Sequence, residues 1–437
     1  MDSIGREFKI NFYLLSALMI TTPFTLFFTL PIAILLIINL IVHWNWKERK
    51  VRLFQNRLRS FFIIFISLYI IYLIGLLYTS NLKSGITNLE NKLWFLLAPL
   101  ILFSMDPQWF TPKVRQRLIL IFIFSTILMA IFNITCSFCK YLNYPKSFLF
   151  FYQNATHIPI SLYRFQTGAP SWRNMHPVYL SMYVTFAFVA SLYYLYFSKI
   201  SMRRWKRIIL TVGIIVLFIY NYLLQSKAGI LILLVLLLIA FLFLINKTKW
   251  QFSKSILFML FLGGLTIGVM HYGSNSTNRV PAAIKDLSRE RTKKDLHSPH
   301  GSTSQRLVAW RIAFQQSMKH LPLGTGTGDA IDVMAEAYKE QGYINLYNAR
   351  LNPHNQYLQT LLTVGIIGFG ILIFYLGYPF YHAFKRKKLL LLAFIFIVAL
   401  NLMTESMFET GSGANFIALF MSLLTYDSFV AEEEKLG

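Results

Sequence analysis

The sequence predicts an all-α, polytopic integral membrane protein with about twelve transmembrane helices and one large hydrophilic loop on the outer side. The 437 residues are 56% hydrophobic and only 14% charged, with a mean hydropathy of +0.52. A soluble core of this length hides less apolar surface, so the excess is expected to face lipid. Apolar segments of about 20 residues recur along the chain, which is the length that crosses a hydrocarbon layer roughly 30 Å thick. The sequence lacks period-two alternation, which favours helices over a β-barrel.

The individual spans follow from the apolar segments. The first segment, residues 8–42, is too long for one crossing and is broken at Thr21-Thr22-Pro23, so it predicts two helices. The remaining spans are predicted at residues 61–78, 89–104, 118–139, 178–197, 208–224, 229–245, 255–271, 355–378, 389–407 and 414–428. The predicted organisation is residues 1–271 as transmembrane helices 1 to 9, residues 272–353 as the large loop with short helices, and residues 354–437 as transmembrane helices 10 to 12 with a cytoplasmic tail.

The orientation follows from the basic residues, which give the chain a formal net charge of +24. They cluster in every second connection, at residues 47–59, 113–117, 199–207, 247–254 and 385–388, and basic loops are retained on the cytoplasmic side. Both termini are therefore expected in the cytoplasm and the large loop outside. A nucleic-acid partner is not expected, because it needs the basic residues on one accessible face with aromatic platforms between them.

The large loop carries its own helical pattern. Leu307, Trp310, Phe314 and Ser317 are expected on one face of a helix. A Gly-rich turn at residues 323–329 ends that helix and caps a second one at about residues 330–341. This turn is not a phosphate-binding P-loop, since no strand precedes it and no Gly-Lys-Ser or Gly-Lys-Thr follows. The Cys-x-x-Cys spacing of Cys136 and Cys139 has no companion cysteines and is interpreted as packing.

The clearest local motif, Asn-Pro-His-Asn-Gln-Tyr-Leu at residues 352–358, lies where the large loop re-enters the membrane. Pro353 fits the first turn of the incoming helix, and Gly365 and Gly368 further along would let another helix pack closely. His354 would then lie at the mouth of the bundle. A histidine there can act as a general base near neutral pH, although a residue that only starts a helix is the plainer interpretation.

His-Asn-x-Tyr-Leu followed by Gly-Ile-Ile-Gly resembles the signature of the O-antigen ligase and polymerase superfamily. Members of that superfamily also have about twelve spans, with a large periplasmic loop just before the motif. That loop carries an Arg followed by a Trp, here Arg306 and Trp310, and a Gly-rich turn that here reads His-Leu-Pro-Leu-Gly-Thr-Gly at residues 320–326. The specific motifs cover about residues 306–368.

The resemblance implies a GT-C-like membrane glycosyltransferase of the bacterial inner membrane, with its active site on the periplasmic side. Its donor would be a glycan linked to undecaprenyl diphosphate, and its acceptor a hydroxyl of lipid A-core or another glycan. The transfer would invert the anomeric centre and need no metal or other cofactor, and membrane lipids would be the remaining partners. Two alternatives stay open: a polysaccharide polymerase of the same superfamily, and a transporter or flippase for a lipid or small anion, although no matching halves are found.

The resemblance also implies roles for individual residues. His354 would be catalytic, while Arg306 and Lys227 would hold the diphosphate, whose negative charge grows as the sugar leaves. Lys227 stands where the family has an Arg, and it lacks the planar fork that grips a phosphate through two bonds. Glu405, Asn355 and His176 are assigned supporting roles.

Each assignment has a plainer alternative. Arg306 would be a solvated loop cation, and Lys227 a lysine reaching the membrane interface. Glu405 and Glu409 would hold helix ends against the basic loop, and His176 would satisfy backbone groups.

Overall fold

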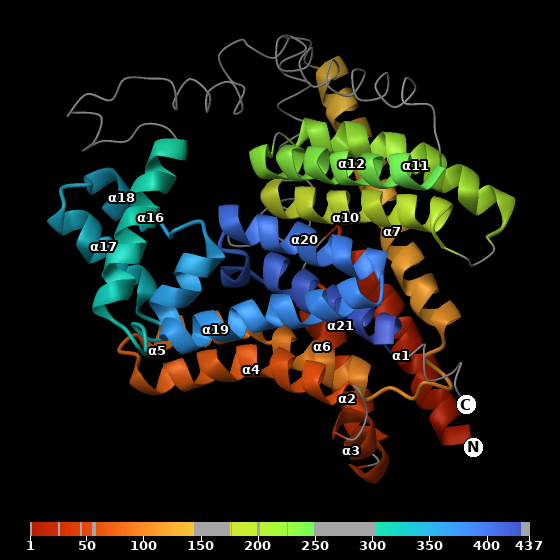
Figure 1. The fold of residues 1–437 in the computed structure, drawn as a ribbon, viewed down its shortest axis with the longest axis horizontal. Coiled ribbons are helices and arrows are strands. Elements are labelled where there is room, and N and C mark those ends of the chain that lie inside the picture. Colours follow the sequence, from red (N-terminus) through yellow and green to blue (C-terminus); the bar gives the residue numbers. More distant parts are fainter. Residues whose placement is uncertain are drawn as a thin grey trace.

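The computed structural model describes residues 2–24, 27–43, 46–54, 58–143, 175, 177–198, 202–224, 226–248 and 302–429, and all regular structure in these ranges is helical (Figure 1). The first half contains α1 (Asp2–Thr21), α2 (Thr29–Val42), α3 (Trp46–Phe54), α4 (Arg59–Gly75), the short 3₁₀ helix η1 (Leu76–Tyr78), α5 (Leu82–Lys92), α6 (Trp94–Phe103) and α7 (Pro112–Asn143). The second half contains α10 (Pro177–Tyr196), α11 (Arg204–Leu223), α12 (Lys227–Thr248), α16 (Ser302–Lys319), α17 (Ala330–Glu340), α18 (Ile344–Ala349), α19 (Gln356–Lys385), α20 (Leu389–Thr404), the 3₁₀ helix η2 (Met407–Glu409) and α21 (Gly411–Phe429).

Six described helices are long and apolar enough to cross a membrane, which agrees with a helical membrane protein. They are Arg59–Tyr78, Leu82–Phe103, Pro112–Cys136, Pro177–Tyr196, Arg204–Leu223 and Gln356–Lys385. A seventh candidate is a pair of helices, Thr29–Val42 and Lys47–Phe54, which meet at 118°. The predicted break in residues 8–42 is confirmed, because α1 and α2 are separate helices. The predicted span at residues 255–271 lies outside the described residues.

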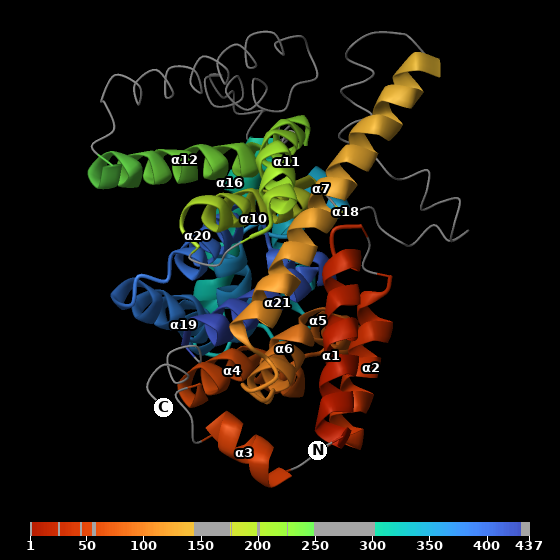
Figure 2. The ribbon, with the colours of Figure 1, turned by 90° about the vertical axis from the view of Figure 1, so that its right-hand side faces the viewer.

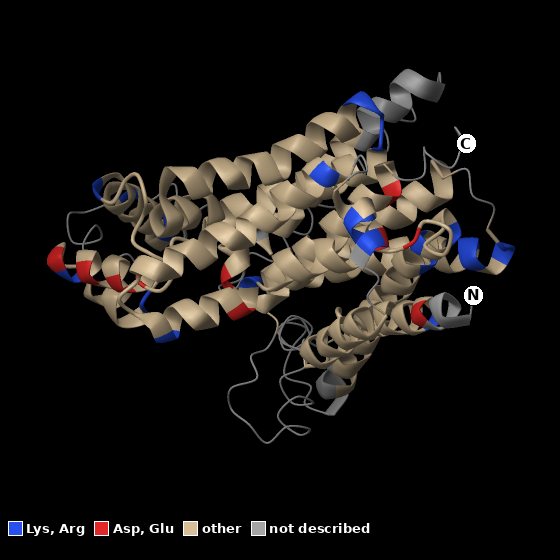
Figure 3. Cartoon of the chain, turned by 90° about the horizontal axis from the view of Figure 1, so that it is seen from below, with Lys and Arg blue, Asp and Glu red and all other residues tan. Residues whose placement is uncertain are grey.

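The bundle is a series of helices in contact. From bottom to top of Figure 1, α4 packs on α19, α19 on α20, α20 on α10, and α10 on α11. Helices α6 and α21 pack against each other and against α4 and α20 respectively, while α1 packs on α2 and α7 (Figure 2). Most charged residues lie toward the two ends of the bundle, and the stretch between them is almost free of charge (Figure 3). This distribution is the one expected when the middle of the bundle is in lipid.

Aromatic rings fill the centre of the bundle. Six of them meet where α7, α10, α20 and α21 come together: Phe122, Tyr183, Phe186, Phe394, Phe416 and Phe420. All six are buried, and most of their contacts are edge-to-face or tilted, which suits the charge distribution of aromatic rings, while Tyr183 and Phe416 are stacked. The outward face of α11, by contrast, carries exposed Ile208, Val212, Ile215 and Ile219 at helical spacing. Such a stripe is stable when lipid covers it.

Helices α16, α17 and α18 form a small unit with its own core at one end of the bundle (Figure 1). Ala309, Ile312 and Ala313 from α16 pack against Met334 and Tyr338 from α17. Leu362 of α19 also belongs to this core and joins the unit to the bundle. Burial raises the pKa of Tyr338 above its usual value, as expected for a phenol in an apolar core.

The predicted face of α16 is wrong in part. The helix forms where the pattern placed it, but Leu307 and Phe314 point outward. Of the predicted face only Ser317 is fully buried, beside Ala309 and Ala313, which were not predicted to face inward. Ala309, Ile312 and Ala313 occupy the inner face, where α16 packs on α17 and α19. The periodicity identified the helix, whereas the side that packs is decided by its neighbour.

Helix α19 is interrupted at Val364 and Gly365, where the backbone leaves helical geometry. Gly365 has φ of 66°, and a Cβ there would lie 1.9 Å from the carbonyl oxygen of Pro322. The Gly-rich loop supplies partners for the backbone groups that the break frees: Thr325 N donates to Leu362 O at 2.8 Å, Gly326 N donates to Thr363 O at 2.9 Å, and Ile366 N donates to Pro322 O at 3.0 Å. An unpaired peptide group in lipid is costly, so the loop makes the broken span possible. The sequence predicted that another helix would pack closely at Gly365. In the structure the Gly-rich loop packs there instead.

Candidate functional site

The candidate site lies at the end of the bundle covered by α16 to α18, where α20 ends and α19 begins (Figure 1). Asn355 caps α19, and its side chain accepts a hydrogen bond from Leu358 N at 3.1 Å. Helix α19 therefore starts at Gln356. Pro353 was predicted in the first turn of this helix, but it lies before the cap. The start of α19 is tied to the chain after α20, because Phe408 N donates to the Gln356 side chain at 2.7 Å.

His354 contacts a buried carboxylate at this junction. Its Nδ1 lies 2.7 Å from Oε1 of Glu405, whose side chain is only 6% exposed against 26% for the histidine. A carboxylate accepts hydrogen bonds, so it favours the tautomer with the proton on Nδ1. Nε2 then carries a lone pair, and no described residue bonds to it. Glu405 thus orients the histidine through Nδ1, and Nε2 is left to bind a second partner.

Arg306 approaches the same carboxylate from α16. Its Nη2 lies 3.6 Å from Oε2 of Glu405, and its side chain is 29% exposed. Glu405 thereby connects His354 with Arg306, two residues that the sequence separates by 48 positions and that were predicted to act together. A guanidinium has five N–H donors, so one contact with Glu405 leaves most of them for an anion.

The backbone at His354 is strained. Its φ is 47°, in the left-handed region that non-glycine residues seldom adopt, and its N–H donates to the Asn352 side chain at 3.0 Å. The next peptide is also held, because Asn355 N donates to the Ser406 hydroxyl at 3.2 Å. Strain of this kind persists only where the surroundings impose it, and it is concentrated at functional sites.

The loop before His354 is fixed at its other end by Arg350. Arg350 also has a left-handed φ, of 46°, and its guanidinium pairs with Asp332 on α17. The hydrogen bond from Asn81 and the charge of Arg350 hold the pKa of Asp332 below its usual range. Asn81 caps α5, so this carboxylate links α17 and the loop to the start of a span.

A second buried charge pair lies next to the site. Lys92, at the end of α5, is 1% exposed, and its Nζ is 3.0 Å from Oε1 of Glu409. The ammonium also lies 4.7 Å from the ring centre of Tyr72, whose hydroxyl is 3.0 Å from that of Thr360. Gln356 donates to the same Thr360 hydroxyl at 3.1 Å. Buried polar contacts therefore run from the start of α19 to Lys92.

Two predicted site residues are not placed by the structure. Lys227 is the first residue of α12, but its side chain lies outside the described part of the chain, and so does His176. The neighbourhood of Lys227 is nonetheless tightly packed: a Cβ on Gly229 would lie 1.6 Å from the hydroxyl oxygen of Ser181 on α10. The remaining predicted residues, His354, Arg306, Glu405 and Asn355, come together.

The sequence analysis missed Lys92, Tyr72 and Tyr179. Tyr179 on α10 is buried and lies within hydrogen-bonding reach of Thr410, next to the 405–409 turn. The signal for Lys92 was present, since a lysine inside a predicted span is expensive and commonly functional. Nothing in the local sequence distinguishes Tyr72 or Tyr179 from the other aromatic residues.

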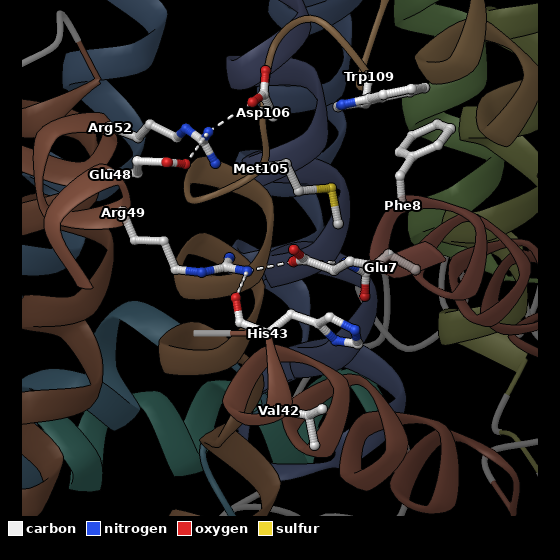
Figure 4. A pocket seen from close by; sticks show the side chains of 11 residues that line it. Glu7, Phe8, Val42, His43, Glu48, Arg49, Arg52, Met105, Asp106 and Trp109 are labelled. Atoms are coloured by element: carbon white, nitrogen blue, oxygen red, sulfur yellow. Dashed lines mark hydrogen bonds and ion pairs between the residues drawn. The ribbon is translucent and has the colours of Figure 1, made fainter. Parts of the chain in front are cut away.

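A cavity of about 330 Å³ lies at the other end of the bundle, near the start of α1 (Figure 4). Its cations face acids: Arg49 pairs with Glu7, and Arg52 lies 2.7 Å from Asp106. These pairs tie α1 and α3 to the turn after α6, so we interpret the cluster as structural. Within the described ranges, no three His, Cys, Asp or Glu side chains are grouped as metal ligands.

Comparison with known proteins gives one family match. Residues 212–374 match a family model described as O-antigen ligase. The match supports an assignment to the O-antigen ligase and polymerase superfamily. The matched stretch includes Arg306 and His354 and ends within α19, whereas Glu405 and Lys92 lie outside it. No curated protein matches the chain. The apolar helices indicate a multi-pass membrane protein, and the match supports glycan transfer of the O-antigen ligase or polymerase type in general.

Proposed function

We propose that this protein transfers a glycan from undecaprenyl diphosphate to an acceptor hydroxyl, that of lipid A-core, at the periplasmic face of the bacterial inner membrane. The observation that carries the proposal is the convergence of His354 and Arg306 on the buried Glu405, within 2.7 Å and 3.6 Å. An imidazole base and a guanidinium that holds an anion are two groups that can serve transfer from a diphosphate.

The proposed reaction is a single displacement. Nε2 of His354 takes the proton of the acceptor hydroxyl, the acceptor oxygen forms a bond to the anomeric carbon, and the bond from that carbon to the diphosphate oxygen breaks. Attack from the face opposite the leaving group inverts the anomeric centre. The imidazolium that forms is stabilised by Glu405, and the released undecaprenyl diphosphate is stabilised by Arg306, with Lys227 as a second cation. No metal ion takes part in this scheme.

The experiment uses purified protein in nanodiscs with a fluorescent lipid-linked donor and lipid A-core. Loss of His354 removes general-base catalysis, which contributes about 10²- to 10⁴-fold. We therefore expect His354→Ala to lower kcat by about that factor at equal folded yield. His43→Ala is the matched control, since His43 lines the cavity at the opposite end of the bundle. Undiminished transfer by His354→Ala would remove the histidine from the mechanism.

The same chemistry serves a polymerase, in which the acceptor is a second carrier-linked glycan. Gene deletion separates the two: accumulation of carrier-linked polymer with uncapped lipid A-core supports the ligase, and single-unit caps support the polymerase. A transporter is disfavoured by α19. Transporters use broken helices to bind substrate in the gap, but here the Gly-rich loop takes up the freed backbone groups.

A further inference from the structure

Helix α16 has a second apolar face besides the one that packs on α17. Leu307, Phe314 and Met318 are 38%, 52% and 43% exposed. Their spacing of seven and four residues places them on one side of the helix. A helix in a loop surrounded by water is expected to be polar on its outer side, so this stripe calls for an apolar neighbour.

The direction of α16 suits a position in the plane of a membrane. It crosses the ends of α4 and α19 instead of running along them (Figures 1 and 2). Helices that lie in the interface of a bilayer have one apolar face in the lipid and basic residues beside it. Of the basic residues of α16, Arg306 and Lys319 flank the stripe. Arg311 lies on the same side as Leu307 and Phe314, and its Nη2 donates to the Tyr343 hydroxyl at 2.7 Å.

The apolar stripe continues into residues that face outward on candidate spans. Leu321 and Leu323, which follow α16, are 39% and 54% exposed. The carbonyl of Leu323 accepts a hydrogen bond from Tyr78 at 2.6 Å, so Leu323 lies beside the end of the α4 span. The carbonyl of Pro322 accepts from Ile366 N at 3.0 Å, which places the same loop beside α19.

The neighbouring residues of both spans are exposed and apolar. Leu77, next to Tyr78, is 85% exposed, and Ile366 and Ile367 are 48% and 51% exposed. The outward side of a membrane span contacts lipid. The outward residues of η1, the loop and α19 are therefore apolar at the end of the bundle that α16 crosses, as is the stripe on α16.

We propose that the outward face of α16, formed by Leu307, Phe314 and Met318, rests on the lipid of the outer leaflet as an interfacial helix. The contact with lipid stands independently of the proposed transfer reaction. If that reaction is also correct, the interfacial position holds Arg306, near the start of α16, at the depth where the diphosphate of a lipid-anchored donor emerges. The lipid tail then stays in the bilayer while the sugar reaches His354.

The test measures which quencher reaches a fluorophore on α16. In a background with Cys136→Ser and Cys139→Ser, a cysteine introduced by Phe314→Cys is labelled with bimane, and the full-length protein is placed in nanodiscs. Phe374→Cys, at a 65% exposed position of the α19 span, is the lipid-facing control. Glu336→Cys, on α17 with its side chain 60% exposed, is the water-facing control.

We expect the label at position 314 to lose fluorescence with brominated acyl chains, as at 374, and to resist aqueous iodide. A label at 314 that behaves like the one at 336 would overturn the proposal, because α16 would then face water. Protection from both quenchers would also overturn it, because a protein surface would then cover the stripe. Met318→Cys repeats the measurement should Phe314→Cys fail to fold. The readout does not use transfer activity, so a failure here is distinct from a failure of the proposed function.

Discussion

Replacement of Glu405 by glutamine tests whether the buried carboxylate organises the site. The change keeps the size of the side chain and removes only its charge. In the wild type the carboxylate fixes the proton of His354 on Nδ1 through a 2.7 Å hydrogen bond. An amide can turn its NH₂ group toward Nδ1, which would favour the tautomer with the proton on Nε2 and so block the proposed base.

The size of the effect follows from the contacts of Glu405 with His354 and Arg306. A hydrogen bond to a charged group contributes about 1.5–3 kcal/mol. Since 1.36 kcal/mol is a factor of ten in rate, its loss predicts a fall in kcat of roughly 10- to 150-fold. The contact to Arg306 is longer, at 3.6 Å, and this arginine is partly exposed, so its loss is worth only about 0–1 kcal/mol. The donor KM should therefore change by less than about fivefold.

The assay is steady-state transfer in nanodiscs at equal folded yield, with Glu336→Gln on the exposed face of α17 as the matched control. A drop in kcat with a nearly constant donor KM would agree with a carboxylate that acts through the histidine. A Glu405→Gln protein as fast as the wild type would refute this reasoning, and so would a variant whose only defect is a raised donor KM.

Three further predictions concern stability. Gly365→Ala forces a side chain into a left-handed conformation 1.9 Å from Pro322 O, so the thermal unfolding midpoint should fall, with the backbone alone contributing about 1–3 kcal/mol. Lys92→Met leaves Glu409 buried without its partner, which costs about 3–5 kcal/mol, whereas Lys92→Met combined with Glu409→Leu should recover most of that loss by the same measurement. Asp332 has a lowered pKa when folded, so its ionised form stabilises the fold above the ordinary carboxylate pKa of about 4, and the contribution disappears as the pH falls through the folded pKa. Asp332→Asn should therefore lower the thermal unfolding midpoint at pH 7. On acidification the midpoint of this variant should fall by less than that of the wild type.

Matched variants separate these effects from general damage. Gly370→Ala and Gly377→Ala lie in the same helix as Gly365, but a Cβ there meets nothing within 4 Å, so neither should lower the midpoint. A double variant of Lys92 and Glu409 as unstable as the single one would show that the two charges are not coupled. An Asp332→Asn protein with an unchanged pH dependence would assign the acid sensitivity to other carboxylates.

Helices were predictable because each depends on its own residues. The break between α1 and α2, the helix α16 and the second loop helix after the Gly-rich turn all appear where the sequence placed them. The break inside α19 was not predicted. Gly365 supplies the backbone freedom, but the break is stable only because the 322–326 loop, about 40 residues earlier in the sequence, bonds to the freed groups.

The candidate site was predictable where a motif exists. The His-Asn-x-Tyr-Leu motif identified His354, and the resemblance to a family added Arg306, but neither fixed the distance between them. Lys92 could have been singled out as a charge in an apolar span, yet its partner Glu409 could not. That pairing depends on α5 lying against the η2 turn, a contact between residues more than 300 positions apart.

By itself, the sequence determined that the chain is a helical membrane protein, because local hydrophobicity and turn residues act over one helix at a time. It also determined which residue types are available for chemistry at the re-entry motif. Only the tertiary structure decided that Glu405 joins His354 to Arg306, that a loop fills the break in α19, and that α16 turns an apolar face outward. These features depend on packing between distant segments, where the energy of a buried charge or an unpaired peptide group is set by whichever neighbour the fold brings to it.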